Sequence, residues 1–186
     1  MKIDSSCNIV IPVGDVQVFS SPLPEAVFES SYRIIAAAQD IVFSHGLRSA
    51  IISGPRIAAI AIRDAGKAIE EDGGVDSSSA LLAEIKRIST AIVPTDSGFD
   101  MVPIDAAIKS GAISQEDWKE AEGTLAFFTC VWYAESRKNR KEFLEGLVNM
   151  MNFSCTSQNC ADFVASLTTS NAEETASKPE ESSVPT

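Results

Sequence analysis

Residues 114–137 constrain the fold of this chain more than any other stretch, because aromatic residues gather there at helical spacing. One apolar face recurs every three or four residues, and a second apolar line runs beside it. The first face consists of Trp118, Ala121, Leu125, Phe128 and Trp132. The second line consists of Phe127, Val131 and Ala134. A helix that is apolar around much of its girth is either central in the domain or carries an interaction surface, and we expect the central position.

The ends of this helix are marked as well. Ser114 can accept a hydrogen bond from an unpaired backbone N–H, and the acidic residues after it complement the positive end of the helix dipole. A basic run from Arg137 onward suits the carbonyl end. We therefore expect a helix that begins directly after Ser114.

Most of the remaining chain also carries helical periodicity, separated by Gly and Pro. The expected helices cover residues 25–45, 54–71, 77–92, 104–110 and 141–151. The second of these starts at Gly54-Pro55, since proline is tolerated in a first helical turn. The third uses Ile88 and Ile92 as part of its apolar side, and residues 94–98 form the loop after it.

The N-terminal segment is different, because residues 8–11 and 16–19 are rich in β-branched residues and flank a turn with Pro12, Gly14 and Asp15. This pattern predicts a β-hairpin over residues 8–19. A lone hairpin is marginal in water, so it must lie against the helices or pair with another chain. Its edge is therefore either a cover over the core or a docking strand. The overall prediction is a mainly α fold, a compact multi-helix domain with a short N-terminal β-hairpin.

The composition changes after residue 152. We expect a helical body over residues 1–152, a short amphipathic arm over 153–170 and a disordered acidic tail over 171–186. The arm carries the apolar residues Phe163, Val164 and Leu167 after a helix cap at Ser157 or Asn159. Such a helix can lie in a partner's groove, fold back over the protein's own groove, or dock permanently on the core.

Charge and hydropathy narrow the classes of function. The net charge of −11 and the pI near 4.5 argue against nucleic-acid binding, which needs a basic face. We expect no membrane partner, because the most apolar run, residues 50–62, is interrupted and short. The N-terminus lacks the pattern of a secretory signal. These features predict a soluble protein of the cytosol.

Catalytic and metal-binding patterns are weak. The cysteines Cys7, Cys130, Cys155 and Cys160 do not have zinc-ligand spacing, and His45 is the single histidine. Because His45 lies near a predicted helix end, we expect its side chain to satisfy the unpaired backbone carbonyl groups there. We find no phosphate-binding loop, dinucleotide fingerprint or metalloprotease motif. The expectation is a non-enzymatic protein with no catalytic residue, no metal and no cofactor.

The order of segments resembles a known family. These segments are NIVIPVGDVQVFSSPLP, PEAVFESSYRII, SGPRIAAIAIRDAG, LLAEIKRIST, VPIDAAIKSGAI, TLAFFTCVWY and TSQNCADFVASLTTS. Followed by an acidic tail, this order resembles the tail assembly chaperones of long-tailed bacteriophages over nearly the whole chain. The SLTTS segment and the helix that contains Phe127 and Phe128 carry most of the likeness.

The resemblance implies a function. The protein would bind the hydrophobic tape-measure protein in the cytoplasm of the host bacterium, keep it soluble and help tail-tube subunits polymerise around it. It would then be absent from the mature virion. The candidate contacts are Phe127, Phe128 and Trp132, if exposed, and Phe163, Val164 and Leu167 on the arm. Two alternatives remain: a structural virion component, such as a neck or tail-completion protein, and a small helical enzyme or regulator with a polar pocket near His45.

Overall fold

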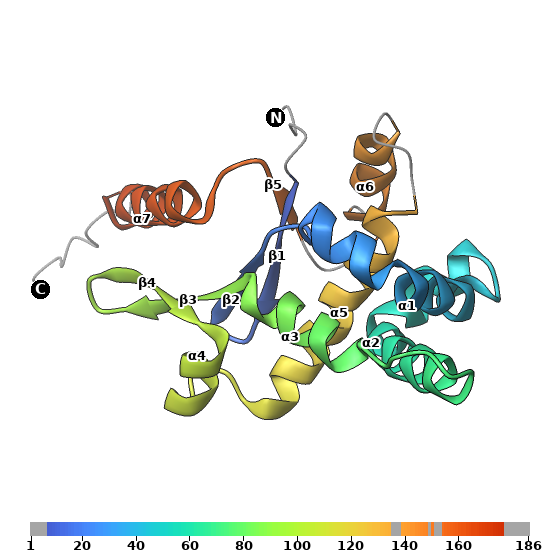
Figure 1. Ribbon diagram of the computed structural model, residues 1–186. Helices are drawn as coiled ribbons and strands as arrows, with labels where there is room; N and C mark the ends of the chain where they lie inside the picture. The colour runs from blue at the N-terminus through green and yellow to red at the C-terminus, as the bar shows by residue number, and fades with distance from the viewer. Residues whose placement is uncertain (1–6, 135–138, 149, 151–153, 177–186) are drawn as a thin grey trace, which may run out of the picture.

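The computed structural model describes residues 7–134, 139–148, 150 and 154–176, and within these it shows an α+β fold with a five-stranded sheet (Figure 1). The expectation of a mainly α domain with only an N-terminal hairpin is therefore wrong. The elements in chain order are β1 (Asn8–Val13), β2 (Val16–Ser20), α1 (Glu25–Phe43), α2 (Leu47–Glu71), α3 (Ser78–Arg87), β3 (Ser89–Thr95), β4 (Gly98–Pro103), α4 (Ile104–Ser110), α5 (Gln115–Trp132), α6 (Arg140–Val148), β5 (Ser154–Thr156) and α7 (Cys160–Ala176).

The sheet has the strand order β4-β3-β2-β1-β5, and every neighbouring pair is antiparallel. The predicted hairpin is confirmed as β1 and β2, which close at the pair Val13 and Val16 around Gly14 and its positive φ of 59°. Both hairpin strands lie inside the sheet, because β5 pairs with β1 and β3 pairs with β2. Over Asn8–Val10 of β1 and Gln17–Ser20 of β2, the outer edges of the hairpin are therefore already paired within the chain.

Alternate residues of the central strands face opposite sides of the sheet. Ile9, Val18 and Ala91 point into the main core, which they share with the helices. There α5 lies between the sheet and the pair formed by α1 and α2 (Figure 1). The central position that the aromatic pattern predicts for residues 115–132 is thus confirmed.

The second helix begins earlier than expected, at Leu47, so that Gly54 and Pro55 lie inside α2. A proline within a helix lacks one backbone hydrogen bond, which normally disfavours it. Here the same turn of α2 packs directly against α5. Gly54 lies against the ring of Phe127, and Gly123 of α5 lies against the backbone carbonyl of Pro55. The close contact between the two helices favours the continuous helix over a start at Pro55.

The third helix is shorter than expected, because α3 ends at Arg87 and residues 89–95 form strand β3. Ile92 therefore belongs to the sheet, and the expected loop over residues 94–98 is the tip of the β3–β4 hairpin. The Ser89 hydroxyl lies 2.7 Å from the Ile85 carbonyl and 2.9 Å from the Ser20 hydroxyl, which joins the helix end to β2.

The C-terminal segment contains both a strand and a helix. Strand β5 pairs with β1, so the expected arm contributes to the sheet before it enters α7. Because α7 extends to Ala176, the expected disordered tail begins in helix, and residues 177–186 lie outside the described part of the chain. The predicted helix near residues 141–151 is α6, and its expected end at Met151 also lies outside. Among the described residues, no helix is long and apolar enough to cross a membrane.

Candidate partner-binding site

The aromatic residues of α5 lie in the main core. Phe127, Phe128 and Trp132 have only 1%, 3% and 6% of their surface exposed. Phe127 faces Phe43 of α1 with 6.2 Å between ring centroids, and Phe128 contacts Trp132 at 5.6 Å. The sequence offered these three residues as partner contacts only on the condition that they are exposed. Because they are buried, they stabilise the helical layer and present no surface to a partner.

The apolar residues of α7 form a separate hydrophobic cluster on the other side of the sheet. Phe163, Val164 and Leu167 are half-buried, and they pack on side chains that the sheet turns away from the main core. The buried sheet residues of this outer cluster are Val10, Phe19 and Ile92. The rings of Phe19 and Phe163 lie 5.9 Å apart at an angle of 41°. The structure thus brings the three predicted arm residues together over one apolar patch of the sheet.

Sequence reasoning missed the sheet half of this cluster. The signal was present in β1, where Ile9, Val10 and Ile11 are all apolar although alternate residues face opposite sides. A strand that is apolar on both sides is covered on both sides. Ile92 could not be found this way, because its spacing from Ile85 and Ile88 also fits a helix.

The cap of α7 is well defined. Its first turn is held by Asn159, whose Oδ1 accepts a hydrogen bond from the Asp162 backbone N–H at 2.9 Å. In return, the Asn159 Nδ2 donates to Asp162 Oδ2 at 2.7 Å. Of the two caps that the sequence allowed, the structure therefore uses Asn159 rather than Ser157.

The link between β5 and α7 is fixed to the central hairpin. The Asn8 side-chain amide donates to the Gln158 carbonyl at 2.8 Å, and the Gln158 N–H donates to the Thr156 hydroxyl at 3.1 Å. Asn8 and Thr156 are both buried. These bonds hold the start of α7 near the sheet, while the rest of α7 depends on the half-buried apolar contacts of the outer cluster.

Two cysteines, Cys130 and Cys155, have raised pKa values. The Cys7 thiol hydrogen-bonds the Cys155 thiol, and together with burial this raises the pKa of Cys155 well above the ordinary range. Burial alone raises the pKa of Cys130 to about 12. Since the thiolate is the nucleophile and the metal ligand, neither group is activated at neutral pH. Within the described residues, no group of three or more His, Cys, Asp or Glu side chains is placed to hold a metal ion.

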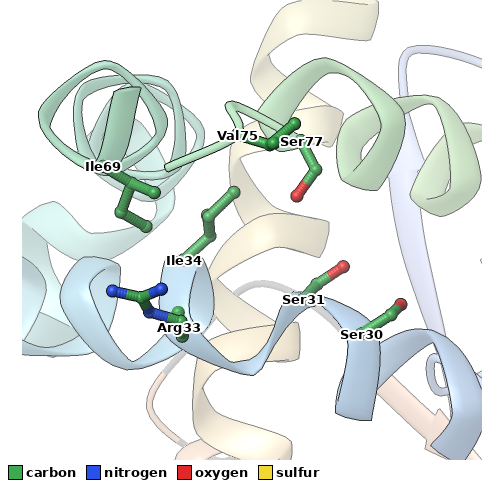
Figure 2. Close-up of a pocket in the computed structure, with 7 residues that line it drawn as sticks. All are labelled: Ser30, Ser31, Arg33, Ile34, Ile69, Val75 and Ser77. Carbon is green, nitrogen blue, oxygen red and sulfur yellow. The ribbon is translucent and has the colours of Figure 1, made fainter. Parts of the chain in front are cut away.

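The described surface has cavities of a size that suits small molecules. Figure 2 shows a cavity of about 360 Å³ in which Arg33, Ser31 and Ser77 surround the apolar side chain of Ile34. A second, of about 350 Å³, includes the ion pair of Arg63 with Glu122, and a third, of about 170 Å³, adjoins the β1–β2 turn. No histidine or cysteine lines any of the three. These cavities therefore bring together no nucleophile with a histidine base.

Comparison of the chain with family models, curated proteins and solved structures gives no match. Within the described residues, the chain is an α+β domain with one sheet face in a helical core and the other under the C-terminal helix α7.

Proposed function

We propose that the chain is a non-enzymatic tail assembly chaperone that binds an amphipathic helix of a phage tape-measure protein. Two lines support the proposal: the resemblance of the sequence to that family, and the outer cluster, which is built for exchangeable contacts between an apolar helix and an apolar surface. In the same proposal, the complex brings tail-tube subunits to the tape measure, and the protein leaves before the virion matures.

The outer cluster is the single observation that carries the proposal. Its apolar residues on α7 are half-buried, and its sheet residues lie on the side of the sheet away from the main core. Release of α7 would expose Val10, Phe19 and Ile92 and would free Phe163 and Leu167 without opening the main core. An amphipathic helix of the tape measure can then contact both surfaces, since helix-in-groove recognition uses apolar residues at helical spacing.

The charge of the chain suits this role. A complex with a long hydrophobic protein needs a surface that resists self-association, and a net charge of −11 keeps the copies apart. In the free protein, α7 covers the apolar patch of the sheet, which keeps that patch from binding nonspecifically.

The test is co-expression with the tape-measure protein of the phage that encodes the chain. The double variant Phe163→Asp with Leu167→Asp places charge in the outer cluster and leaves the main core unchanged. The control variant Ala161→Asp adds the same kind of charge to an exposed position of α7. We expect the double variant to lower soluble tape measure by about tenfold, and the control to match the wild type.

Full tape-measure solubility with the double variant, shown to be folded by circular dichroism, would contradict the role of the outer cluster. Mass spectrometry of purified virions separates the proposal from its alternative, a structural virion component. A chaperone is absent from mature particles, whereas a neck or tail-completion protein is present in fixed copy number.

A further inference from the structure

The solvent-facing side of α2 carries a ridge of alternating cationic and apolar residues. We define the α2 ridge as Arg48, Ile52, Arg56 and Ile60, which follow one another at every fourth position. Such residues form a continuous row along a helix surface. All four are exposed, and the two isoleucines have 72% and 54% of their surface accessible. These are large values for isoleucine in a helix that also has a buried face.

The charge of the α2 ridge is unusual for this protein. Residues 47–63 contain no Asp or Glu, although the whole chain has a net charge of −11. Within the described part of the chain, neither Arg48 nor Arg56 forms an ion pair. Arg63, one turn further along, is already paired with Glu122 at 2.5 Å. The two ridge arginines are therefore the cations of α2 that remain available to an outside carboxylate.

We propose that the α2 ridge is a docking site for an acidic amphipathic helix of another protein. Two helices pack well when such four-residue ridges fit into each other's grooves, at a crossing angle of about −50°. Apolar side chains of the partner would lie in the groove beside Ile52 and Ile60, and partner carboxylates would face Arg48 and Arg56. Arginine binds carboxylates with two parallel hydrogen bonds, which favours Glu or Asp at those positions.

The other possible occupants fit less well. Two isoleucines bury too little apolar surface to anchor a protein on a membrane, and the net negative charge of the chain repels anionic lipid and nucleic acid. A second copy of the chain carries the same net charge of −11, which opposes association. At physiological salt, charges more than about 8 Å away are largely screened, so a short acidic helix on the ridge interacts mainly with Arg48 and Arg56.

This site is separate from the outer cluster. The helix α2 lies on the opposite side of the sheet from α7 (Figure 1), and no residue is shared between the two surfaces. Loss of tape-measure binding through α7 variants therefore says nothing about the α2 ridge, and the two proposals can fail independently.

The experiment uses the full chain and two fluorescein-labelled helical peptides of about 20 residues, a length at which an alanine-rich peptide holds helix in water. Both probes are helices of alanine and glutamine in which every fourth residue belongs to one row. In the acidic probe this row alternates Glu and Leu, and in the basic probe it alternates Lys and Leu. Fluorescence anisotropy gives the Kd of each. We expect the acidic probe to bind at least about tenfold more tightly than the basic probe, and less tightly as salt is raised.

The decisive variant is Arg48→Glu with Arg56→Glu, which should raise the Kd of the acidic probe by about tenfold or more. Glu at position 48 suits the first turn of α2, so the variant should fold. If the double Glu variant does not fold, the milder double variant Arg48→Gln with Arg56→Gln replaces it in the same measurement. The control is Arg33→Glu with Lys109→Glu, which makes the same charge change at other exposed positions and should leave the Kd unchanged.

Three results would overturn the proposal. The first is equal affinity for both probes or no effect of the ridge variants. The second is binding to phosphatidylserine vesicles that the ridge variants abolish. The third is a self-associating wild type, in sedimentation equilibrium, that becomes monomeric in the ridge variants.

Discussion

At the scale of single residues, Gly123 is where the two main helices of the core meet. A Cβ at this position would overlap the backbone carbonyl of Pro55 in α2, and backbone atoms cannot rotate aside as a flexible side chain can. Gly54 has the matching role on α2, where it faces the ring of Phe127. The spacing of α2 and α5 is therefore set by residues that have no side chain.

The variant Gly123→Ala should destabilise the protein by about 1–3 kcal/mol, because the added methyl group forces the helices apart. The matched control is Gly146→Ala in α6, where no neighbouring atom lies near the new Cβ. That change should stabilise by about 0.5–1 kcal/mol, because alanine favours the helix. Urea denaturation measures both, and equal effects of the two substitutions would contradict the close approach of α2 and α5.

The buried thiol of Cys130 makes the free energy of unfolding depend on pH in the alkaline range. Its pKa is about 12 in the folded protein, compared with 9.0 for an ordinary thiol. The folded state therefore keeps a proton that the unfolded chain releases above pH 9. The stabilisation is fully present below pH 9 and is lost as pH rises toward 12. Between these limits, the contribution of this group changes by about 1.4 kcal/mol per pH unit.

The variant Cys130→Ala removes this contribution. We expect the unfolding free energy of the wild type to fall more steeply than that of the variant between pH 9 and 11, in urea titrations at each pH. Parallel curves would show that the thiol is not buried as described. Other groups that titrate in this range affect both proteins equally.

At the scale of elements, two helix caps of similar geometry should have different consequences. The Ser114 hydroxyl accepts from the Asp117 N–H at 3.0 Å and caps the central helix α5, while Asn159 caps the peripheral helix α7. The sequence predicted the Ser114 cap from the residue type and left the α7 cap open between Ser157 and Asn159, because Ser and Asn are both side chains that satisfy unpaired N–H groups.

We expect Ser114→Ala to lower the global free energy of unfolding by about 1 kcal/mol, and Asn159→Ala to leave it nearly unchanged. The second variant should instead speed hydrogen exchange in α7, because this helix can open without the main core. Denaturant titration and exchange mass spectrometry separate the two effects. A global loss in Asn159→Ala would mean that α7 belongs to the main cooperative unit.

Element type was predictable only where one pattern was unambiguous. The hairpin strands were found because their β-branched runs flank a turn, and α5 was found because its apolar faces are long and strongly periodic. The end of α3 at Arg87 could not be predicted, since Ile85, Ile88 and Ile92 continue a helical spacing into β3. Pairing with β2, which only the tertiary structure supplies, decides that Ser89 begins a strand.

At the scale of the whole molecule, the sheet joins the first described strand of the chain to the last one. Asn8 of β1 pairs with Thr156 of β5, and these strands close the fold beside the central hairpin. On one side of the sheet lies the main core with α5, and on the other lies the outer cluster with α7 (Figure 1). Two clusters of such different size should open with different free energies.

Native-state hydrogen exchange should therefore rank the helices. We expect α7 to exchange through local opening at the lowest free energy of the described helices, and α2 and α5 to exchange only on global unfolding. This ranking follows from the burial of the apolar side chains. Those of α7 are half-buried, whereas those of α5, such as Ala126 and Phe127, are fully buried. If α7 exchanges as slowly as α5, the helix is a fixed part of the fold and does not release the outer cluster.

Only the α7 half of the outer cluster could be predicted from the sequence, because only that half depends on a local pattern. Phe163, Val164 and Leu167 form an apolar turn that the sequence shows directly, because helical neighbours are three and four residues apart. Their contacts on Val10, Phe19 and Ile92 come from three strands that are distant in sequence, and no local pattern specifies which strands are adjacent. The burial of Phe127 and Trp132, which removes them as partner contacts, is also a result of packing.

The sequence by itself determined the acidic charge, the central aromatic helix, the hairpin, the cap at Ser114 and the apolar turn of α7, because each depends on residues near one another in the chain. Only the tertiary structure decided that the hairpin lies within a five-stranded sheet, that residues 89–103 form two of its strands and that α7 covers its far face. Strand pairing joins residues that are far apart in sequence, and local periodicity carries no information about which of them meet.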